Sequence, residues 1–181
     1  MGPGVNIELM SNVYLVGFMG AGKTSVGAAL AAQLGYGFLD LDERLSERFG
    51  APIREIFDDS GEEIFRVAET EELSRSTDLE RVVVATGGGT FCSEANREII
   101  FGAGGVSVFL DAPWEELCRR LPGENLDRPM FGDEEMARLL LSRRMPHYRQ
   151  ATLTVAVKAD DTPLQTAARV VEALREAPCA T

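Results

Sequence analysis

The chain has 181 residues, of which 45% are hydrophobic and 26% are charged. This is the composition of an ordinary globular protein and the length suits one domain, so collagen-like, disordered and small disulfide-stapled proteins are excluded. The 29 acidic and 18 basic residues give a net charge of −11, which argues against a nucleic-acid partner because a polyanion repels nucleic acid.

Short β-branched runs alternate with amphipathic stretches along the chain, which predicts strands separated by helices. The runs indicate five strands, over residues 13–16, 38–40, 82–85, 106–110 and 153–157. The stretches between them indicate helices over residues 23–34, 42–49, a piece after Pro52, about 60–76, 93–101, one opening at Asp111 and Pro113, a long one from Asp133 interrupted near Pro146, and a last one opening at Thr162 and Pro163. Residues 121–132 contain two prolines and two glycines and indicate a loop.

Five strands in alternation with helices predict a parallel sheet with helices on both faces, in a three-layer α/β domain. Sheets of this kind bind ligands beyond the carboxyl ends of their strands. The segments that directly follow the strands are therefore the places to look for functional residues.

The segment Gly17-Phe18-Met19-Gly20-Ala21-Gly22-Lys23-Thr24 matches the phosphate-binding pattern GxxxxGK[ST] between the first strand and the first helix. Its glycines let backbone N–H groups surround phosphate oxygens, and the start of the helix adds partial positive charge. In this pattern Lys23 reaches the β- and γ-phosphates and the Thr24 hydroxyl binds Mg²⁺. The alternative, a glycine-rich turn with an incidental lysine, fits less well because the chain has only one other lysine, Lys158.

The segment Asp40-Leu41-Asp42 follows the second strand. The two-residue period of a strand would place both carboxylates on the same side, facing the site. Beside a bound triphosphate, one would hold the waters of the metal and the other would orient the attacking hydroxyl. The alternative is that Asp42 is only the N-cap of the next helix.

Three consecutive glycines, Gly87 to Gly89, follow Thr86 at the end of the third strand. They make a bare backbone surface that could donate to an anionic or hydroxylated ligand, although a simple turn explains them as well. Arg66 lies about one turn into its predicted helix. Its alternative is a surface ion pair with Glu62 or Glu69, at helical spacing.

Residues 121–132 are a candidate mobile lid with Arg128-Pro129 at their centre. A cation on a lid that closes over the transferring phosphate would stabilise charge and exclude water. The alternative is an arginine in an exposed loop. We interpret the single histidine, His147, as a helix-end residue rather than a base, because no partner is visible nearby in the sequence.

The cysteines and the hydropathy of the chain indicate the cellular compartment of the protein. Cys92, Cys118 and Cys179 are odd in number and widely spaced, which fits neither a disulfide framework nor a zinc site. No apolar run approaches the length of a membrane span, and residues 1–12 lack the features of a signal peptide. We expect a cytoplasmic protein with reduced thiols and no membrane contact.

Together these motifs resemble the shikimate kinases, small P-loop kinases of aromatic amino-acid biosynthesis. The resemblance covers nearly the whole chain after Asn12, and residues 1–11 look like a short extension. The family pattern is a P-loop, D-x-D, I-F-x-x-x-G-E-x-x-F-R-x-x-E, G-G-G, R-P-x and Y-x-x-x-A. We match these motifs to Gly17–Thr24, Asp40–Asp42, Ile56–Glu69, Gly87–Gly89, Arg128–Met130 and Tyr148–Thr152.

The resemblance implies a P-loop kinase fold whose five-stranded parallel sheet has the order 2-3-1-4-5. It implies a single domain over residues 1–181, with a nucleotide core, a substrate-binding subregion at about 42–76 and a mobile lid at about 121–132. The implied reaction is Mg²⁺-dependent transfer of phosphate from ATP to the 3-hydroxyl of shikimate, giving shikimate 3-phosphate and ADP. Shikimate and ATP are the implied partners, and a monomer is the expected state.

The resemblance also implies roles for individual residues. The catalytic residues would be Lys23, Asp42 and Arg128, the last on the lid. ATP would be bound by Gly20, Ala21, Gly22, Lys23, Thr24, Ser25, Arg128 and Arg120, the last against adenine with Arg119 as the alternative. Mg²⁺ would be held by Thr24 and, through water, by Asp40. Shikimate would be bound through its hydroxyls by Asp42, through its carboxylate by Arg66 and Arg149, and along the pocket wall by Gly88 and Gly89.

Two other functions remain open at this stage. One is another small-metabolite P-loop kinase, such as a gluconate or nucleoside monophosphate kinase, which would share the P-loop but would not call for both Arg66 and the triple glycine. The other is a catalytically inactive relative that binds nucleotide as an interaction module. The presence of Lys23, Asp42 and Arg128 argues against the second.

Overall fold

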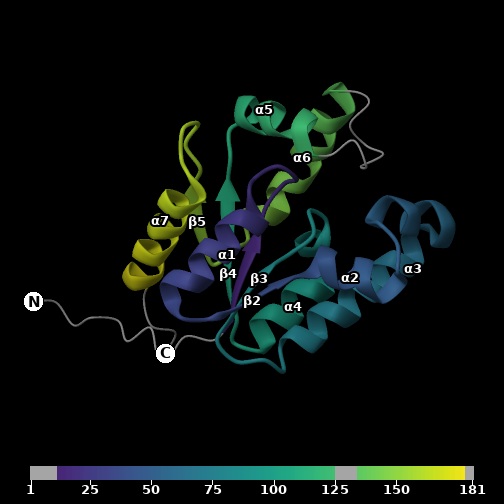
Figure 1. The fold of residues 1–181 in the computed structure, drawn as a ribbon, viewed down its shortest axis with the longest axis horizontal. Helices are drawn as coiled ribbons and strands as arrows, with labels where there is room; N and C mark the ends of the chain where they lie inside the picture. The colour runs from purple at the N-terminus through teal and green to yellow at the C-terminus, as the bar shows by residue number, and fades with distance from the viewer. Residues whose placement is uncertain (1–11, 125–133, 178–181) are drawn as a thin grey trace, which may run out of the picture.

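The computed structural model describes residues 12–124 and 134–177. Its sheet consists of five parallel strands in the order β2-β3-β1-β4-β5, which confirms the predicted order (Figure 1). The strands are β1 Val13–Val16, β2 Gly37–Asp40, β3 Val82–Ala85, β4 Val106–Asp111 and β5 Leu153–Ala156. Both β1 and β3 are buried along their whole length, as continuous runs of apolar residues in a parallel sheet require.

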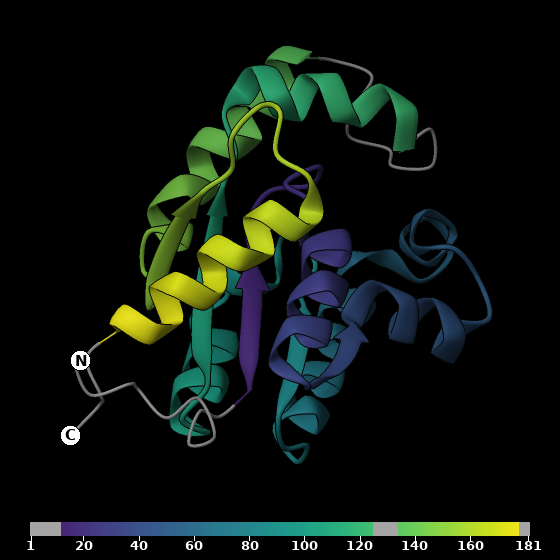
Figure 2. The same cartoon turned by 60° about the vertical axis from the view of Figure 1, so that its left-hand side comes forward.

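The α-helices between and after the strands are α1 Lys23–Leu34, α2 Leu41–Phe49, α3 Ile53–Ser76, α4 Glu94–Gly102, α5 Trp114–Glu124, α6 Glu134–Tyr148 and α7 Pro163–Glu176, and a short 3₁₀ turn, η2, spans Thr90–Cys92. Figure 2 shows α1 and α7 side by side on one face of the sheet. None of the helices in the described ranges is long and apolar enough to cross a membrane.

Neighbouring residues of β1 point their side chains to opposite faces of the sheet. A Cβ on Gly27 of α1 would lie 3.4 Å from Leu15, so Leu15 packs toward α1. The hydroxyl of Tyr14 accepts a 3.4 Å hydrogen bond from Ser76 at the end of α3, on the opposite face. The alternation of a strand thus joins both helical layers to the central strand in one core.

Several helix ends follow the sequence signals. Gly35 and Gly50 end α1 and α2 in the left-handed conformation, with φ of 66° and 67°. Ser93 caps α4, and Thr162 with Gln165 forms a capping box at α7. Gly61, with φ 82° and ψ 161°, separates the two helical pieces that make up α3.

Two predicted boundaries were wrong. Helix α5 continues through residues 121–124, which we had assigned to the loop. Helix α6 is not interrupted at Pro146 but continues to Tyr148, so residues four apart across this proline share a helix face. The rest of the predicted lid, with Arg128, lies outside the described residues, as do residues 1–11.

The segment matched to Y-x-x-x-A departs from that pattern, because Thr152 stands at the alanine position. Its backbone N–H donates to Ser107 Oγ at 2.9 Å, and the two hydroxyl oxygens are 3.2 Å apart. The threonine therefore adds a polar link between β4 and the residue before β5.

Candidate active site

The P-loop leaves the carboxyl end of β1, the central strand, and enters α1. Gly17, Gly20 and Gly22 have φ values of 146°, 79° and 90°, which L side chains rarely adopt. Gly22 is the N-cap of α1, so the unpaired N–H groups of the first helical turn begin there. The loop conformation thus requires the glycines that the phosphate-binding pattern specifies.

Lys23 is folded against its own loop. Its side chain is buried, and Nζ donates hydrogen bonds to the carbonyl oxygens of Gly17 at 2.9 Å and Phe18 at 3.0 Å. The ammonium group is therefore already held at the site where phosphate oxygens would replace or join these acceptors. The expected contact of the lysine with phosphate stays a prediction.

Thr24 and Asp40 lie together although 16 positions separate them. Thr24 Oγ1 donates to Asp40 Oδ2 at 2.6 Å, while Asp40 Oδ1 accepts from the backbone N–H groups of Asp42 and Glu43. A hydroxyl and a carboxylate are hard oxygen ligands suited to Mg²⁺, which usually takes few protein ligands beside phosphates and water. The described residues contain no cluster of three or more His, Cys, Asp or Glu that could hold a metal ion.

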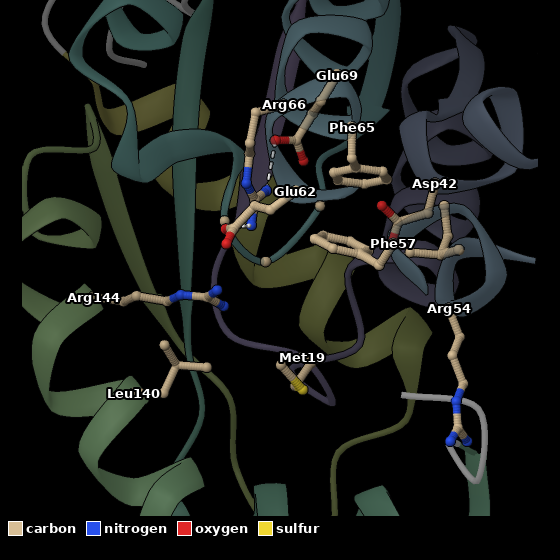
Figure 3. Close-up of a pocket in the computed structure, with 14 residues that line it drawn as sticks. Met19, Asp42, Arg54, Phe57, Glu62, Phe65, Arg66, Glu69, Leu140 and Arg144 are labelled. Atoms are coloured by element: carbon tan, nitrogen blue, oxygen red, sulfur yellow. Dashed lines mark hydrogen bonds and ion pairs between the residues drawn. The ribbon is translucent and has the colours of Figure 1, made fainter. Parts of the chain in front are cut away.

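The sequence pattern placed both aspartates on one side of a strand. This prediction was wrong. Strand β2 ends at Asp40, which is the N-cap of α2, and Asp42 lies in the first turn of that helix. The cap that we had considered for Asp42 therefore belongs to Asp40. Asp42 nevertheless faces the site, because it lines the larger of the two cavities described below (Figure 3).

The smaller cavity, of about 240 Å³, lies beside the P-loop. Its lining comes from the P-loop and α1, from α5, and from the start of α7: Gly20, Gly22, Ser25, Val26, Arg119, Arg120, Asp161, Pro163 and Thr166. The structure thus brings the predicted ATP-binding residues Gly20, Gly22, Ser25 and Arg120 to one cavity. Ala21, also predicted, is buried in the core beneath the loop.

The larger cavity, of about 390 Å³, lies on the other side of the P-loop, between α2, α3, the triple glycine and α6. Figure 3 shows its polar side chains converging from different elements, with Arg66 and Arg144 reaching in from α3 and α6. The described residues that line it are Met19, Asp42, Ile53, Arg54, Phe57, Glu62, Phe65, Arg66, Glu69, Gly87, Gly88, Gly89, Leu140 and Arg144.

Arg66 is held by two carboxylates and two rings. It donates to Glu69 at 2.8 Å and to Glu62 at 3.4 Å, so both ion pairs that we had considered as the alternative role of Arg66 are present. Its guanidinium carbon is 5.7 Å from the ring centroid of Phe57 and 5.4 Å from that of Phe65. Burial alone would lower the pKa of Arg66, but the ion pairs with Glu69 and Glu62 outweigh it and raise the pKa. The cation is therefore fixed in charge and in place.

Glu69 anchors this arrangement from below. Its side chain is 1% exposed, and Oε1 accepts from the hydroxyl of Thr90 at 2.6 Å. A Cβ on Gly87 would come within 2.6 Å of Glu69 Oε1, and one on Gly89 within 2.7 Å of Arg66 Nη1. The bare backbone of the triple glycine thus gives room to the ion pair, which explains why larger residues would not fit.

Arg149 does not lie in this cavity, contrary to our expectation. It is exposed, whereas Arg144 lines the cavity wall, with Nη1 3.3 Å from where a Cβ on Gly88 would lie. Leu140, Arg144 and Tyr148 follow one another at intervals of four on the same face of α6. This spacing from Tyr148 was the signal for Arg144, and the false interruption at Pro146 obscured it.

The cavity also contains residues that we had not predicted, chiefly an apolar wall of Met19, Phe57 and Phe65. Phe57 and Phe65 pack with ring centroids 4.3 Å apart. Such a wall suits the carbon skeleton of a small ligand and keeps water from its polar groups. His147, by contrast, lines neither cavity, as its interpretation as a helix-end residue predicts.

The two thiols within the described residues show no sign of activation. Cys92 and Cys118 are free, and burial raises the pKa of both. A raised pKa favours the protonated thiol, which is a poor nucleophile.

A parallel sheet of this order, with a P-loop after its central strand and a cavity lined by charged side chains beside that loop, defines a P-loop kinase. Comparison with known proteins then identifies the family. The model of the shikimate kinase family matches residues 19–175. The chain belongs to the shikimate kinase family.

Individual relatives agree with this assignment. The chain is 40% identical to the shikimate kinase of a Nostoc species over 166 residues, which cover 90% of each chain. The solved structure of shikimate kinase from Acinetobacter baumannii in complex with shikimate superposes with a TM-score of 0.86 at 37% identity, covering 93% of this chain and 94% of that one. A gluconokinase from Sinorhizobium meliloti, with a TM-score of 0.53 and 21% identity over 90% of this chain and 94% of that one, shares the fold alone.

Proposed function

We propose that the protein transfers the γ-phosphoryl group of ATP to the 3-hydroxyl of shikimate, giving shikimate 3-phosphate and ADP in aromatic amino-acid biosynthesis. The observation that carries this proposal is the cavity beside the P-loop, which Asp42, Arg66 and Arg144 line together. Shikimate has one carboxylate and three hydroxyls, and such a molecule requires cations for the first and an acceptor for the second. The relative from A. baumannii, solved with shikimate, supports the same assignment.

In this proposal, different residues bind the carboxylate and the hydroxyls of shikimate. Arg66 and Arg144 bind the carboxylate, with Arg144 taking the role that the sequence had suggested for Arg149. Asp42 accepts from the ring hydroxyls and orients the reacting 3-hydroxyl toward the P-loop. Gly88 and Gly89 line the wall between them, and Glu69 keeps Arg66 from turning away.

Phosphoryl transfer requires mainly positioning and neutralisation of charge. Lys23 exchanges the carbonyl oxygens of Gly17 and Phe18 for phosphate oxygens, and the N–H groups at the start of α1 bind the same phosphates. Thr24 and, through water, Asp40 would hold Mg²⁺, which when bound neutralises phosphate charge. Arg128 remains the proposed lid cation, on a segment outside the described residues.

The test is ADP release by the purified protein with ATP and Mg²⁺, with and without shikimate. We expect release that depends on shikimate, and NMR of the product should place the phosphate on the 3-hydroxyl. Gluconate and AMP in the same assay test the rival kinases and should give only background. Turnover with either of them and not with shikimate would overturn the proposal, as would ADP binding without turnover on any acceptor.

We further propose that the protein is a cytoplasmic monomer with no nucleic-acid or membrane partner. The free cysteines and the net charge of −11 support this view. Light scattering of the purified protein at micromolar concentration tests the monomer directly, and a mass near twice 19.7 kDa would contradict it.

A further inference from the structure

A single buried carboxylate on α5 holds both arginines of the nucleotide cavity. Glu116 has a side chain that is 3% exposed. Its Oε1 accepts from Arg120 Nε and from Arg119 Nη2, both at 2.6 Å, and its Oε2 accepts from Arg119 Nε at 3.0 Å. These hydrogen bonds lower the pKa of Glu116, so the carboxylate is charged at neutral pH.

The two arginines extend from Glu116 to different walls of the cavity. Arg119 Nη2 also donates to the carbonyl oxygen of Ala159, at 3.1 Å, in the segment between β5 and α7. Arg120 Nη1 lies 3.3 Å from where a Cβ on Gly22 of the P-loop would be. Glu116 thereby connects α5 to both sides of the cavity, while it does not itself line the cavity.

This geometry fixes how Arg120 is presented. The guanidinium is gripped at Nε, which sets the plane of the group and leaves Nη1 directed toward the P-loop. A long side chain that is free in the empty protein must lose rotamer freedom when a ligand binds, and a side chain already held loses less. A cation positioned in advance therefore binds a nucleotide more tightly than the same cation on a mobile stem.

We propose that Glu116 is a positioning residue of the nucleotide site, which holds Arg119 and Arg120 in their binding geometry before ATP arrives. This inference rests on the proposed function, because it assigns the smaller cavity to nucleotide. It also divides the two arginines by role: Arg120 faces the nucleotide from above the P-loop, and Arg119 ties α5 to the Ala159 segment.

The direction in which neutralising Glu116 changes nucleotide affinity separates a positioning role from a purely electrostatic one. If Glu116 were only a background negative charge, neutralising it would make the cavity more positive and strengthen binding of an anionic nucleotide by about twofold at distances on the order of 10 Å. If Glu116 positions the arginines, the same substitution weakens binding. Opposite directions are expected from the two explanations.

The chain offers a matched control in Glu72. That carboxylate is also buried and also accepts from two arginines, Arg48 at 3.3 Å and Arg75 at 2.6 Å. It joins α2 to α3 and lines neither cavity. Glu72→Gln therefore reproduces the loss of a buried, doubly paired charge without touching the nucleotide site.

The experiment is a calorimetric titration of ADP with Mg²⁺ into the folded full-length variants, together with the KM for shikimate. We expect Glu116→Gln to raise the Kd for ADP by about 3- to 15-fold while the KM for shikimate stays within about twofold. Glu72→Gln should change neither. A Kd for Glu116→Gln that equals that of Glu72→Gln, or falls below the wild-type value, overturns the proposal.

A second variant keeps the test decisive if Glu116→Gln does not fold. Glu116→Asp keeps the charge but withdraws the carboxylate by one methylene group, so it should also weaken ADP binding. Wild-type affinity in Glu116→Asp would mean that charge rather than geometry matters, and would overturn the proposal. Turnover of shikimate by the wild-type protein is measured in the same series and tests the proposed function separately.

Discussion

The hydroxyl of Tyr148 donates a 2.5 Å hydrogen bond to the carbonyl oxygen of Gly88, and this bond joins the end of α6 to the triple glycine. Tyr148 is fully buried and stacks on Phe109 at 5.2 Å between ring centroids. Burial raises the pKa of Tyr148 far above its ordinary value, so the phenol remains a donor at every physiological pH. Arg144, one turn earlier on α6, lies beside the same glycine, with Nη1 3.3 Å from where a Cβ on Gly88 would be.

Tyr148→Phe should therefore loosen the acceptor cavity while leaving the core packed. Loss of one buried hydrogen bond is worth about 0.5–1.5 kcal/mol, so we expect a rise of about 3- to 10-fold in the KM for shikimate and little change in the KM for ATP. Tyr14→Phe is the control, because Tyr14 is equally buried but bonds to Ser76, away from both cavities. Equal kinetic effects of the two variants would reduce the Tyr148 bond to a contribution to stability alone.

The correction from Arg149 to Arg144 gives a direct kinetic prediction. A charge-assisted contact with a carboxylate is worth about 1.5–3 kcal/mol, so Arg144→Ala should raise the KM for shikimate by about 10- to 150-fold. Arg149→Ala, in an exposed residue five positions later, should stay within about twofold of wild type. Steady-state titration of shikimate in both variants checks this. The reverse ranking would mean that the carboxylate binds at Arg149.

The sequence allowed the sheet to be predicted because its central strands have little freedom. Val13–Val16 and Val82–Ala85 are buried on every residue, and such runs fit only the middle of a parallel sheet. The P-loop could also be predicted from the sequence, because its residues are contiguous and their backbone angles require glycine. Sequence patterns were sufficient for these elements because each is formed by residues that are contiguous in the chain.

The acceptor cavity was predicted less well because distant elements build it. Asp42 faces the cavity from a helix and not from a strand, because β2 ends at Asp40, whose side chain caps α2, whereas the period argument required the strand to continue through Asp42. Arg144 was missed because a proline inside a helix usually interrupts it, yet α6 continues through Pro146. The pairing of Phe57 with Phe65 likewise depends on the turn at Gly61, whose geometry the sequence only suggests.

Lys23→Ala should abolish phosphoryl transfer and also cost some stability. The lost ammonium removes the charge that compensates the phosphates, for which we expect a fall in turnover of about 10³-fold. The carbonyl oxygens of Gly17 and Phe18 lose a buried donor, so the free energy of unfolding should fall by about 1–3 kcal/mol. Lys158→Ala removes the only other lysine, which is exposed, and should change neither quantity. Near-normal turnover in Lys23→Ala would remove the basis for the P-loop assignment.

Stability should depend on acid through Asp161. Its hydrogen bonds from Arg169 and from the backbone of Lys158 lower the pKa of this carboxyl below its ordinary value of 3.8. A lowered folded-state pKa means that the stabilisation is fully present above pH 3.8 and is lost as the pH falls toward the folded value. The difference in unfolding free energy between wild type and Asp161→Asn should thus be largest near neutral pH and shrink below 3.8. Urea titrations across this range measure it, with the exposed Glu47→Gln as control; a difference that does not change with pH would contradict the assignment.

The last prediction concerns Asp42→Asn, a nearly isosteric change that removes the charge facing the acceptor. Asp42 lies in the first turn of α2, where an acidic residue interacts favourably with the helix dipole, so we expect a small loss of stability of about 0.3–1 kcal/mol. Turnover should fall much more, by about 10²-fold. This is the lower end for general-base assistance, because a loose phosphoryl-transfer transition state depends little on a base and the orienting role dominates.

Glu43→Gln is the matched control for this variant, since Glu43 is exposed in the same helical turn. It should show the loss of stability without the loss of turnover. Binding of ADP with Mg²⁺ should persist in Asp42→Asn, because Thr24 and Asp40 keep their 2.6 Å contact, while shikimate affinity should fall with the lost acceptor. Two titrations and a rate decide the outcome. If Asp42→Asn keeps more than about a third of wild-type turnover, Asp42 serves the helix and not the reaction; if Mg²⁺-nucleotide binding is lost instead, Asp42 rather than Asp40 supports the metal.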